Sequence, residues 1–272
     1  MIICCGEALI DMIPTTLDSK ETAFIPKIGG AILNTSICLG RLGANVGFLG
    51  AVSKDLFGEM IFEELNNSKV NTSFCIETSN NTTLAFAKIA NGTTTYSFFD
   101  ENSSNRTICL KDVVLDDSVV DTIYVGGISL MSEPNGTEIE NFIAKESSKK
   151  IVFYDPNVRP NFIEDRSLFI QRFEKILSQS DIIKISEEDL EWLYPNGSFE
   201  EIYKQWLNLS LSIIVLTKGS EGAIIKTKNY EVTSRGEKVE VVDTIGAGDI
   251  FNGALLYSLS KKAPFIKISK DR

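Results

Sequence analysis

The sequence predicts an α/β protein whose central sheet is mostly parallel and covered by helices on both faces. Short apolar runs alternate along the chain with longer segments that have helical periodicity. Runs that are apolar at every position are typical of strands buried on both faces, as in a parallel sheet. Two further stretches alternate polar and apolar residues, which predicts a small antiparallel sheet outside the main one.

The expected elements follow one another in a regular order. Strands are predicted at Ile2–Cys5, Val46–Leu49, Thr122–Val125, Ile151–Tyr154, Ile182–Ile185 and Ile213–Leu216. Helices are predicted at Ala31–Leu42, Phe57–Leu65, 135–149, 165–178, 187–194 and 199–208. Strands that are separated by helices pair in parallel, so this order predicts a three-layer sandwich with helices outside and the sheet between them.

Residues 12–28 and 82–100 interrupt that order. The second stretch alternates polar and apolar residues around Asn91-Gly92, and an Asn-Gly pair between alternating runs is a strong hairpin signal. We expect these stretches to form a small antiparallel sheet that stands off the main body; an ordinary edge hairpin is the alternative. Residues 1–272 are expected to form a single domain with these two segments inserted.

Composition narrows the possible functions. The net charge of −10 and the pI near 4.7 disfavour nucleic acid or an anionic membrane as the main partner. Five cysteines, an odd number, do not suggest a disulfide framework. The chain shows neither a secretory leader nor the roughly 18 continuous apolar residues of a membrane span, so we expect a cytoplasmic protein.

The sequence contains no histidine. This excludes Ser-His-Asp catalysis, phosphotransfer through histidine and zinc sites built on histidine. Proton transfer must therefore fall to a carboxylate, a lysine, a tyrosine or a thiol.

The most informative segment is a glycine-rich turn at residues 243–249, DTIGAGD. It lies between an apolar run of strand character and a segment of helical periodicity, so its N–H groups and the positive end of the helix dipole converge on one point. Phosphate suits that point, and Asp249 beside it could take a proton from an attacking hydroxyl. The alternative is a tight turn with Asp249 as a helix N-cap.

Several motifs extend this prediction to a family. GEALIDM (6–12), GGAILN (29–34), YDPNVRPNF (154–162), LTKGSEGA (216–223) and DTIGAGD follow one another along the chain. Together they resemble the ribokinase-like (PfkB) carbohydrate kinases, within which the chain looks closest to fructokinases and 2-keto-3-deoxygluconate kinases. The resemblance implies a ribokinase-like three-layer sandwich with a β lid over the sugar. It also implies that Asp249 is the catalytic base and that Gly246, Ala247 and Gly248 form the anion hole.

The resemblance also assigns the sugar side. A carboxylate at Asp11 can accept hydrogen bonds from two neighbouring hydroxyls, and glycines allow the backbone to approach a ligand closely. For Asn34 a satisfied core amide is the alternative, and for Arg159 a surface salt bridge. The implied sugar ligands are Asp11, Gly29, Gly30, Asn34, Phe98, Asn157 and Arg159.

The resemblance implies ATP as the phosphoryl donor, together with Mg²⁺. It also implies a monovalent cation beside the anion hole, for which K⁺ is the candidate. The implied nucleotide contacts are Lys184, Thr217, Lys218, Gly219, Ser220 and Gly222. Magnesium, held mainly by phosphates and water, is assigned to Glu188 and Asp189. Asp243 and the carbonyl of Ile245 are implied to hold the monovalent cation. Ser186 and Asp189 stand where the family carries Asn and Glu.

Two further departures from the family affect the expected substrate. Asp100 stands where relatives carry an arginine in the lid, which favours a neutral sugar over an acidic one. The helices that follow the DTIGAGD helix in the family are expected to be missing from a chain that ends at Arg272.

The expected function is ATP-dependent phosphorylation of fructose, by a homodimer joined through the lid. The alternatives are a 2-keto-3-deoxygluconate kinase and a catalytically weak sugar- or nucleotide-binding relative.

Overall fold

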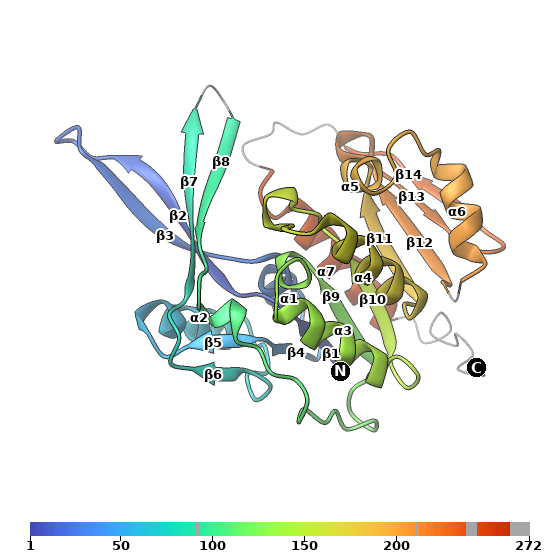
Figure 1. Cartoon of the computed structure of the whole chain (residues 1–272), viewed down its shortest axis with the longest axis horizontal. Coiled ribbons are helices and arrows are strands. Elements are labelled where there is room, and N and C mark those ends of the chain that lie inside the picture. The colour runs from blue at the N-terminus through green and yellow to red at the C-terminus, as the bar shows by residue number, and fades with distance from the viewer. Residues whose placement is uncertain (91–92, 210, 238–243, 262–272) are drawn as a thin grey trace.

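The structure is a computed structural model that describes residues 1–90, 93–209, 211–237 and 244–261. Its main sheet has eight strands in the order β14-β13-β12-β11-β10-β9-β1-β4 (Figure 1). The strands β4 to β12 in this order pair in parallel, whereas β13 and β14 add an antiparallel edge. The strand bounds are β1 Ile2–Cys5, β4 Val46–Leu49, β9 Thr122–Gly126, β10 Ile151–Asp155, β11 Ile182–Ser186, β12 Ile213–Thr217, β13 Ala223–Lys226 and β14 Glu231–Ser234.

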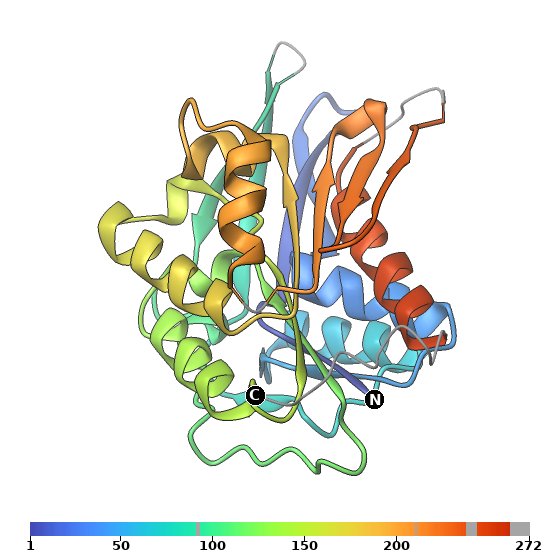
Figure 2. The ribbon, with the colours of Figure 1, turned by 90° about the vertical axis from the view of Figure 1, so that its right-hand side faces the viewer.

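Helices cover both faces of this sheet, as Figure 2 shows from the side. On one face lie α1 (Ala31–Arg41), α2 (Leu56–Asn67) and α7 (Ala247–Lys261), packed in one core cluster. The other face carries a second cluster with α3 (Asn135–Glu146), α4 (Arg166–Ser178), α5 (Glu187–Leu193) and α6 (Phe199–Leu207). Alternate residues of β1 belong to the two clusters, because successive side chains of a strand point to opposite faces. The predicted three-layer sandwich is confirmed.

Every strand and helix predicted within the main body is present, and the ends differ by a few residues. β9 to β12 each extend one residue beyond the predicted end, into the polar positions that begin the loops. The antiparallel strands β13 and β14 and the helix α7 complete the sheet and its cover. Two short strands, β5 (Ala51–Ser53) and β6 (Ile76–Thr78), pair in parallel beside the main sheet.

The second sheet projects from the body in Figure 1 and has the order β3-β2-β7-β8. Its strands are β2 (Leu9–Thr16), β3 (Thr22–Gly29), β7 (Thr83–Ala90) and β8 (Thr93–Phe99). The two hairpins are antiparallel within themselves, but β2 pairs with β7 in parallel. The predicted antiparallel lid is therefore a mixed sheet; the Asn91-Gly92 turn lies outside the described residues. We call these four strands the lid.

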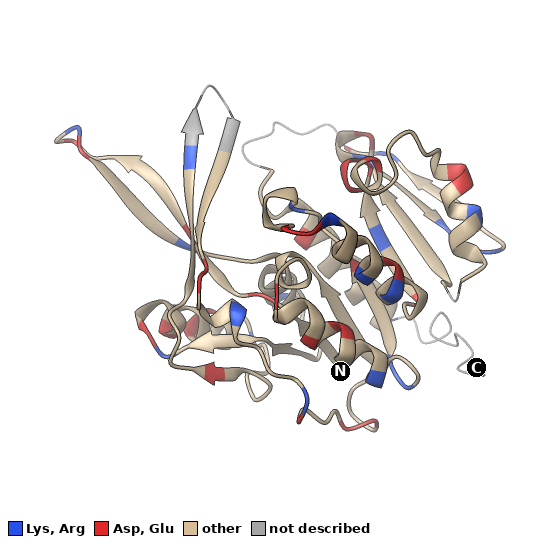
Figure 3. Ribbon diagram, in the orientation of Figure 1, with Lys and Arg blue, Asp and Glu red and all other residues tan. Residues whose placement is uncertain are grey.

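Charged residues of both signs share the outer helices. In Figure 3 α4 and α6 each carry both basic and acidic residues. In the part of the chain that the structure describes, no helix combines the length and the apolar character needed to cross a bilayer.

Candidate active site

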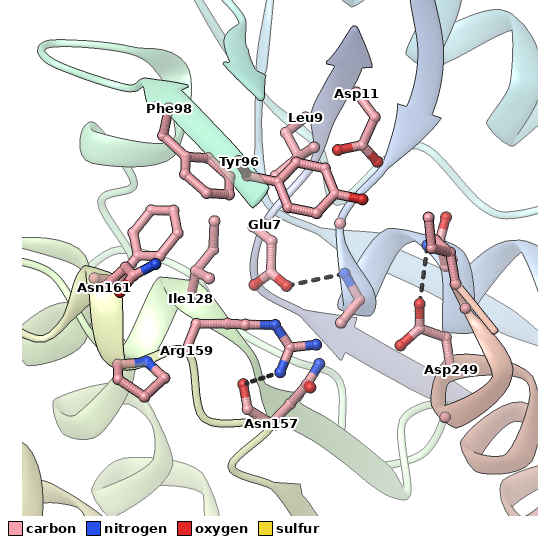
Figure 4. A pocket seen from close by; sticks show the side chains of 18 of the residues that line it. Glu7, Leu9, Asp11, Tyr96, Phe98, Ile128, Asn157, Arg159, Asn161 and Asp249 are labelled. Atoms are coloured by element: carbon pink, nitrogen blue, oxygen red, sulfur yellow. Dashed lines mark hydrogen bonds between the residues drawn. The ribbon is translucent and has the colours of Figure 1, made fainter. Parts of the chain in front are cut away.

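A cavity of about 580 Å³ lies between the lid and the carboxyl ends of the central parallel strands (Figure 4). Ligand sites of α/β proteins occupy this edge, because the loops that follow neighbouring strands converge there. The lid contributes Leu9, Asp11, Thr95, Tyr96 and Phe98. The main body contributes Glu7, the start of α1, the turn after β9, the loop after β10, Glu188 of α5 and the turn before α7. The polar and charged side chains around the cavity are Glu7, Asp11, Asn34, Thr95, Tyr96, Asn157, Arg159, Asn161, Glu188, Thr244 and Asp249.

Asp249 lies in the first turn of α7 and faces this cavity. It is 9% exposed, and Asn34 Nδ2 of α1 donates a hydrogen bond to its Oδ2 at 2.9 Å. Burial raises the pKa of the Asp249 carboxyl, and the Asn34 hydrogen bond opposes that rise. A carboxylate whose pKa is shifted toward neutrality suits general-base chemistry. Asn34 thus touches the predicted base as well as lining the predicted sugar pocket.

The turn before α7 presents backbone donors to the same cavity. Gly246 has a φ of 76°, a left-handed conformation that glycine adopts without strain. Gly246 and Gly248 both line the cavity, and no hydrogen-bond acceptor for their N–H groups occurs among the described residues. The N–H of Ala247 instead donates to the Thr244 carbonyl at 3.2 Å, and Ala247 does not line the cavity. The contribution of Ala247 to the anion hole stays a prediction.

Asp11 lies within lid strand β2. Its carboxylate enters the cavity from the side opposite Asp249 (Figure 4). Burial, and then the charge of Asp249, raise the pKa of Asp11 to about 6. Gly29 does not line the cavity, but a Cβ there would collide with the Asp11 carboxylate. Gly30 does line it, with a φ of 105°.

Aromatic residues close the cavity on the lid side. Phe98 packs edge-on against Phe162 of the main body, with ring centroids 4.2 Å apart, and Tyr96 lies beside it. On the opposite side Arg159 extends into the cavity from the loop after β10 (Figure 4). Its guanidinium donates to the Val158 carbonyl at 3.0 Å, so the alternative of a surface salt bridge is not what the structure shows. Asn157 in the same loop has a φ of 41°.

The predicted nucleotide segment lies next to the cavity rather than in it. Thr217 ends β12, paired in register with Ser186 of β11, and the short turn Gly219–Glu221 follows. Lys218 forms ion pairs with Glu187 at 3.3 Å and Glu221 at 3.0 Å. Neither these residues nor Ser220 and Gly222 line the cavity. They extend the same sheet edge by one strand.

Lys184 is 5% exposed and forms an ion pair with Asp155 at 3.1 Å. Its Nζ lies 3.6 Å from the place where a Cβ of Gly248 would be, so the ammonium group sits directly behind the glycine turn. Sequence reasoning assigned it to the nucleotide, but the described structure pairs it with a buried carboxylate.

The two predicted magnesium residues have different surroundings. Glu188 is exposed and lines the cavity. Asp189 is buried, accepts a hydrogen bond from the Val158 N–H at 2.9 Å and has a pKa raised by burial. It therefore holds the loop after β10 and does not reach the cavity. No group of three or more metal-ligating carboxylates or thiolates occurs among the described residues, and Asp243 lies outside them.

The lid charge predicted at Asp100 does not face the cavity. Asp100 forms an ion pair with Arg106 at 2.8 Å, and neither residue lines the cavity. The argument that Asp100 repels an acidic sugar is therefore wrong, because its charge is paired outside the site.

Several residues that line the cavity were not predicted, among them Glu7, Tyr96 and Asn161; Asn252, which was also not predicted, lies outside the cavity. Glu7, only 2% exposed, lies at the centre of the cavity floor and accepts hydrogen bonds from α1 and from the turn after β9. Asn252 is fully buried and donates to Asp155 Oδ2 at 2.7 Å and to the Tyr124 hydroxyl at 2.9 Å. The GEALIDM motif contains Glu7, so its polar side chain beside a buried strand was the available signal.

A buried carboxylate beside N–H groups that have no acceptor among the described residues, at a cavity under a lid, is the arrangement that a kinase needs to phosphorylate a hydroxyl of a small carbohydrate. The chain belongs to the pfkB family of carbohydrate kinases, whose sequence profile matches residues 1–270.

Individual relatives agree with this assignment. A fructokinase of Rhizobium leguminosarum bv. trifolii is 41% identical over 259 residues, which cover 95% of this chain and 79% of that protein. The structure of a fructokinase from Xylella fastidiosa with bound ATP has a TM-score of 0.88 at 26% identity, covering 96% of this chain and 81% of the other. A fructokinase from Vibrio cholerae O395 in apo form has a TM-score of 0.81 at 25% identity, with coverages of 99% and 92%.

Proposed function

We propose that this protein transfers the γ-phosphoryl group of ATP to a hydroxyl of fructose. The observation that carries the proposal is the placement of Asp249, with its raised pKa, beside the N–H groups of Gly246 and Gly248, which have no acceptor among the described residues, at the edge of the cavity under the lid. The 41% identity to a fructokinase supports the choice of sugar.

The chemistry follows from this placement. A fructose hydroxyl oxygen attacks the γ-phosphorus, the bond from that phosphorus to the β–γ bridging oxygen breaks, and ADP leaves with the bond's electrons. Asp249 accepts the proton of the attacking hydroxyl. The N–H groups of the glycine turn and the N-terminus of α7 stabilise the charge on the transferring phosphoryl oxygens. Asp11, opposite the base, orients the sugar through its hydroxyls.

We assign ATP to the sheet edge beside the cavity. The segment from Thr217 to Gly222 follows β12 there, next to the start of α5, which follows β11 and carries the cavity residue Glu188. The Xylella fastidiosa fructokinase structure with bound ATP supports ATP as the nucleotide. Mg²⁺ neutralises phosphate charge when bound with ATP, and Glu188 is the residue placed to hold it through water. A monovalent cation, K⁺, is assigned beside the Ile245 carbonyl.

The charges around the cavity favour a neutral sugar. Its lining includes the acidic residues Glu7, Asp11, Glu188 and Asp249 and one basic residue, Arg159. An acidic substrate would meet more negative than positive charge there. Arg159 is the observation that favours the second candidate, 2-keto-3-deoxygluconate, whose carboxylate it could bind.

The test is ADP release with fructose, 2-keto-3-deoxygluconate, ribose and adenosine as acceptors, with Asp249→Asn as the control for contaminating activity. We expect fructose to give the highest kcat/KM. A preference for 2-keto-3-deoxygluconate would assign the second candidate. Sugar binding by calorimetry without turnover of any acceptor would instead identify a weak binding relative.

We also infer a homodimer joined through the lid. Phe86 packs edge-on against Phe24 and Phe99, with centroids 5.0 and 5.3 Å apart, on the lid face opposite Phe98. Phe24 is 41% and Phe99 63% exposed, which supports a partner surface. Sedimentation of the Phe24→Ser and Phe99→Ser variants tests this inference, since both variants should be monomeric.

The five free cysteines support a cytoplasmic location.

A further inference from the structure

Glu7 is a buried carboxylate that joins three segments of the cavity floor. Its Oε1 accepts a hydrogen bond from the N–H of Ala31, the first residue of α1, at 3.0 Å. Its Oε2 accepts from the Ser129 hydroxyl at 2.8 Å, in the turn that follows β9. Figure 4 shows the Glu7 carboxylate beneath the lid aromatics, with the bond to the α1 terminus drawn. A buried charge is retained only where donors compensate its lost hydration, and here two segments supply them.

The backbone around Glu7 is shaped to receive it. Gly127 has a φ of 68°, and a Cβ at this position would overlap Glu7 Oε1. Gly30 has a φ of 105°, and a Cβ there would meet the Glu7 carbonyl at 3.0 Å. Both glycines are therefore required by the close approach of Glu7 as well as by their conformation. The backbone around Glu7 therefore has the shape that this side chain needs.

The bond to Ala31 connects Glu7 to the catalytic base. The first backbone bond of α1 runs from the Asn34 N–H to the Gly30 carbonyl at 2.9 Å. The Asn34 side chain then donates to Asp249 Oδ2 at 2.9 Å. A shift of the α1 terminus would move Asn34 relative to Asp249, and it would also move Gly30, which lines the cavity. Through its bond to Ala31, Glu7 therefore fixes the position of the first turn of α1.

We propose that Glu7 is a positioning residue for the sugar side of the site, holding the first turn of α1 in register with Asp249 and with the cavity floor. The kinetic part of this inference rests on the proposed fructokinase function. The structural part does not, because the order of the α1 terminus can be measured without substrate.

Two substitutions separate anchoring from charge. Glu7→Ala removes both acceptors and releases Ala31. Glu7→Gln keeps one oxygen for Ala31, and its amide can donate to the Ser129 hydroxyl, which has a second acceptor in the Gly126 carbonyl at 3.0 Å. The conservative variant should therefore rescue most of what the alanine variant loses. Glu146→Ala is the matched control, since Glu146 is a 5% exposed carboxylate in α3 that does not line the cavity.

The experiment measures fructose and ATP kinetics together with amide hydrogen exchange of residues 30–37. For Glu7→Ala we expect kcat/KM for fructose to fall about 10- to 100-fold, since misplacement by about an ångström has effects of this size. The KM for ATP should stay within about twofold, and exchange in residues 30–37 should accelerate. Glu7→Gln should lose less than about tenfold, and Glu146→Ala should lower only the unfolding temperature.

The inference is overturned if exchange in residues 30–37 is unchanged in Glu7→Ala, or if the KM values for fructose and ATP rise equally. If Glu7→Ala does not fold, Glu7→Leu, which also removes both acceptors but fills the space, decides: wild-type fructose kinetics together with wild-type exchange at residues 30–37 would refute the role. A wild-type protein inactive on fructose would refute the proposed function while leaving the exchange measurement to test Glu7.

Discussion

Asp249→Asn tests the chemistry most directly, because the structure makes it a nearly isosteric change. The new amide oxygen can still accept the 2.9 Å hydrogen bond from Asn34, so the local geometry should survive. What is lost is the ability to take a proton. Loss of a general base costs roughly 10² to 10⁴ in rate, which is about 3 to 5 kcal/mol of transition-state stabilisation.

Stability provides an internal control for the same variant. Burial raises the pKa of Asp249, so the folded protein binds this proton more readily than the unfolded chain does. The contribution of Asp249 to stability is therefore greatest at low pH and is lost as pH rises through the folded pKa. At pH 8 the Asn variant, which carries no buried charge here, should unfold at the same or a higher temperature.

The assay combines ADP release with fructose titration by calorimetry and with thermal unfolding. We expect kcat to fall by at least about 10², with fructose affinity within about threefold of wild type. A folded variant that keeps most of the wild-type kcat would show that Asp249 is not the base. A large loss of fructose affinity at normal kcat would mean that Asp249 binds the sugar instead.

Three further outcomes follow from the site. Gly248→Val should lower kcat by about 10² or more, because a side chain would displace the phosphate from the turn's N–H groups; normal turnover by the folded variant would exclude them. Since the pKa of Asp11 is about 6, protonation should lower kcat/KM for fructose as pH falls through about 6. Asp11→Asn should remove this loss of kcat/KM at low pH. If the loss persists in the variant, a group other than Asp11 causes it. Asp100→Asn should leave the ratio of kcat/KM for fructose to that for 2-keto-3-deoxygluconate unchanged, because Asp100 pairs with Arg106 outside the cavity; a changed ratio would contradict this.

The main sheet was predictable because its strands are marked by local composition. β1 and β4 have the predicted bounds, since fully buried strands are apolar at every position. The parallel pairing of β2 with β7 was not predictable, because hairpin signals specify only pairing between neighbours in sequence.

The position of Asp249 at the cavity was predictable for a similar reason, since it follows a turn that contains two closely spaced glycines, Gly246 and Gly248. The partners of buried polar groups were not. Glu7 finds its donors 24 and 122 residues away in sequence, and nothing in its own segment encodes them. Asp189 was assigned to magnesium because it stands where the family carries Glu, but that match does not say whether the side chain faces the cavity or the core.

The parallel pairing of β2 with β7 affects how a sugar could enter the cavity. Without it, the two hairpins would be separate arms that could tilt independently. With it, Asp11 and Phe98 belong to one sheet, joined through Ala85 by register. Asp11, which we propose to bind the sugar hydroxyls, and Phe98, which we propose to cover them, are thus parts of one continuous sheet. A tilt of that sheet would make or break both contacts together, so an open lid would also be one without its carboxylate in place.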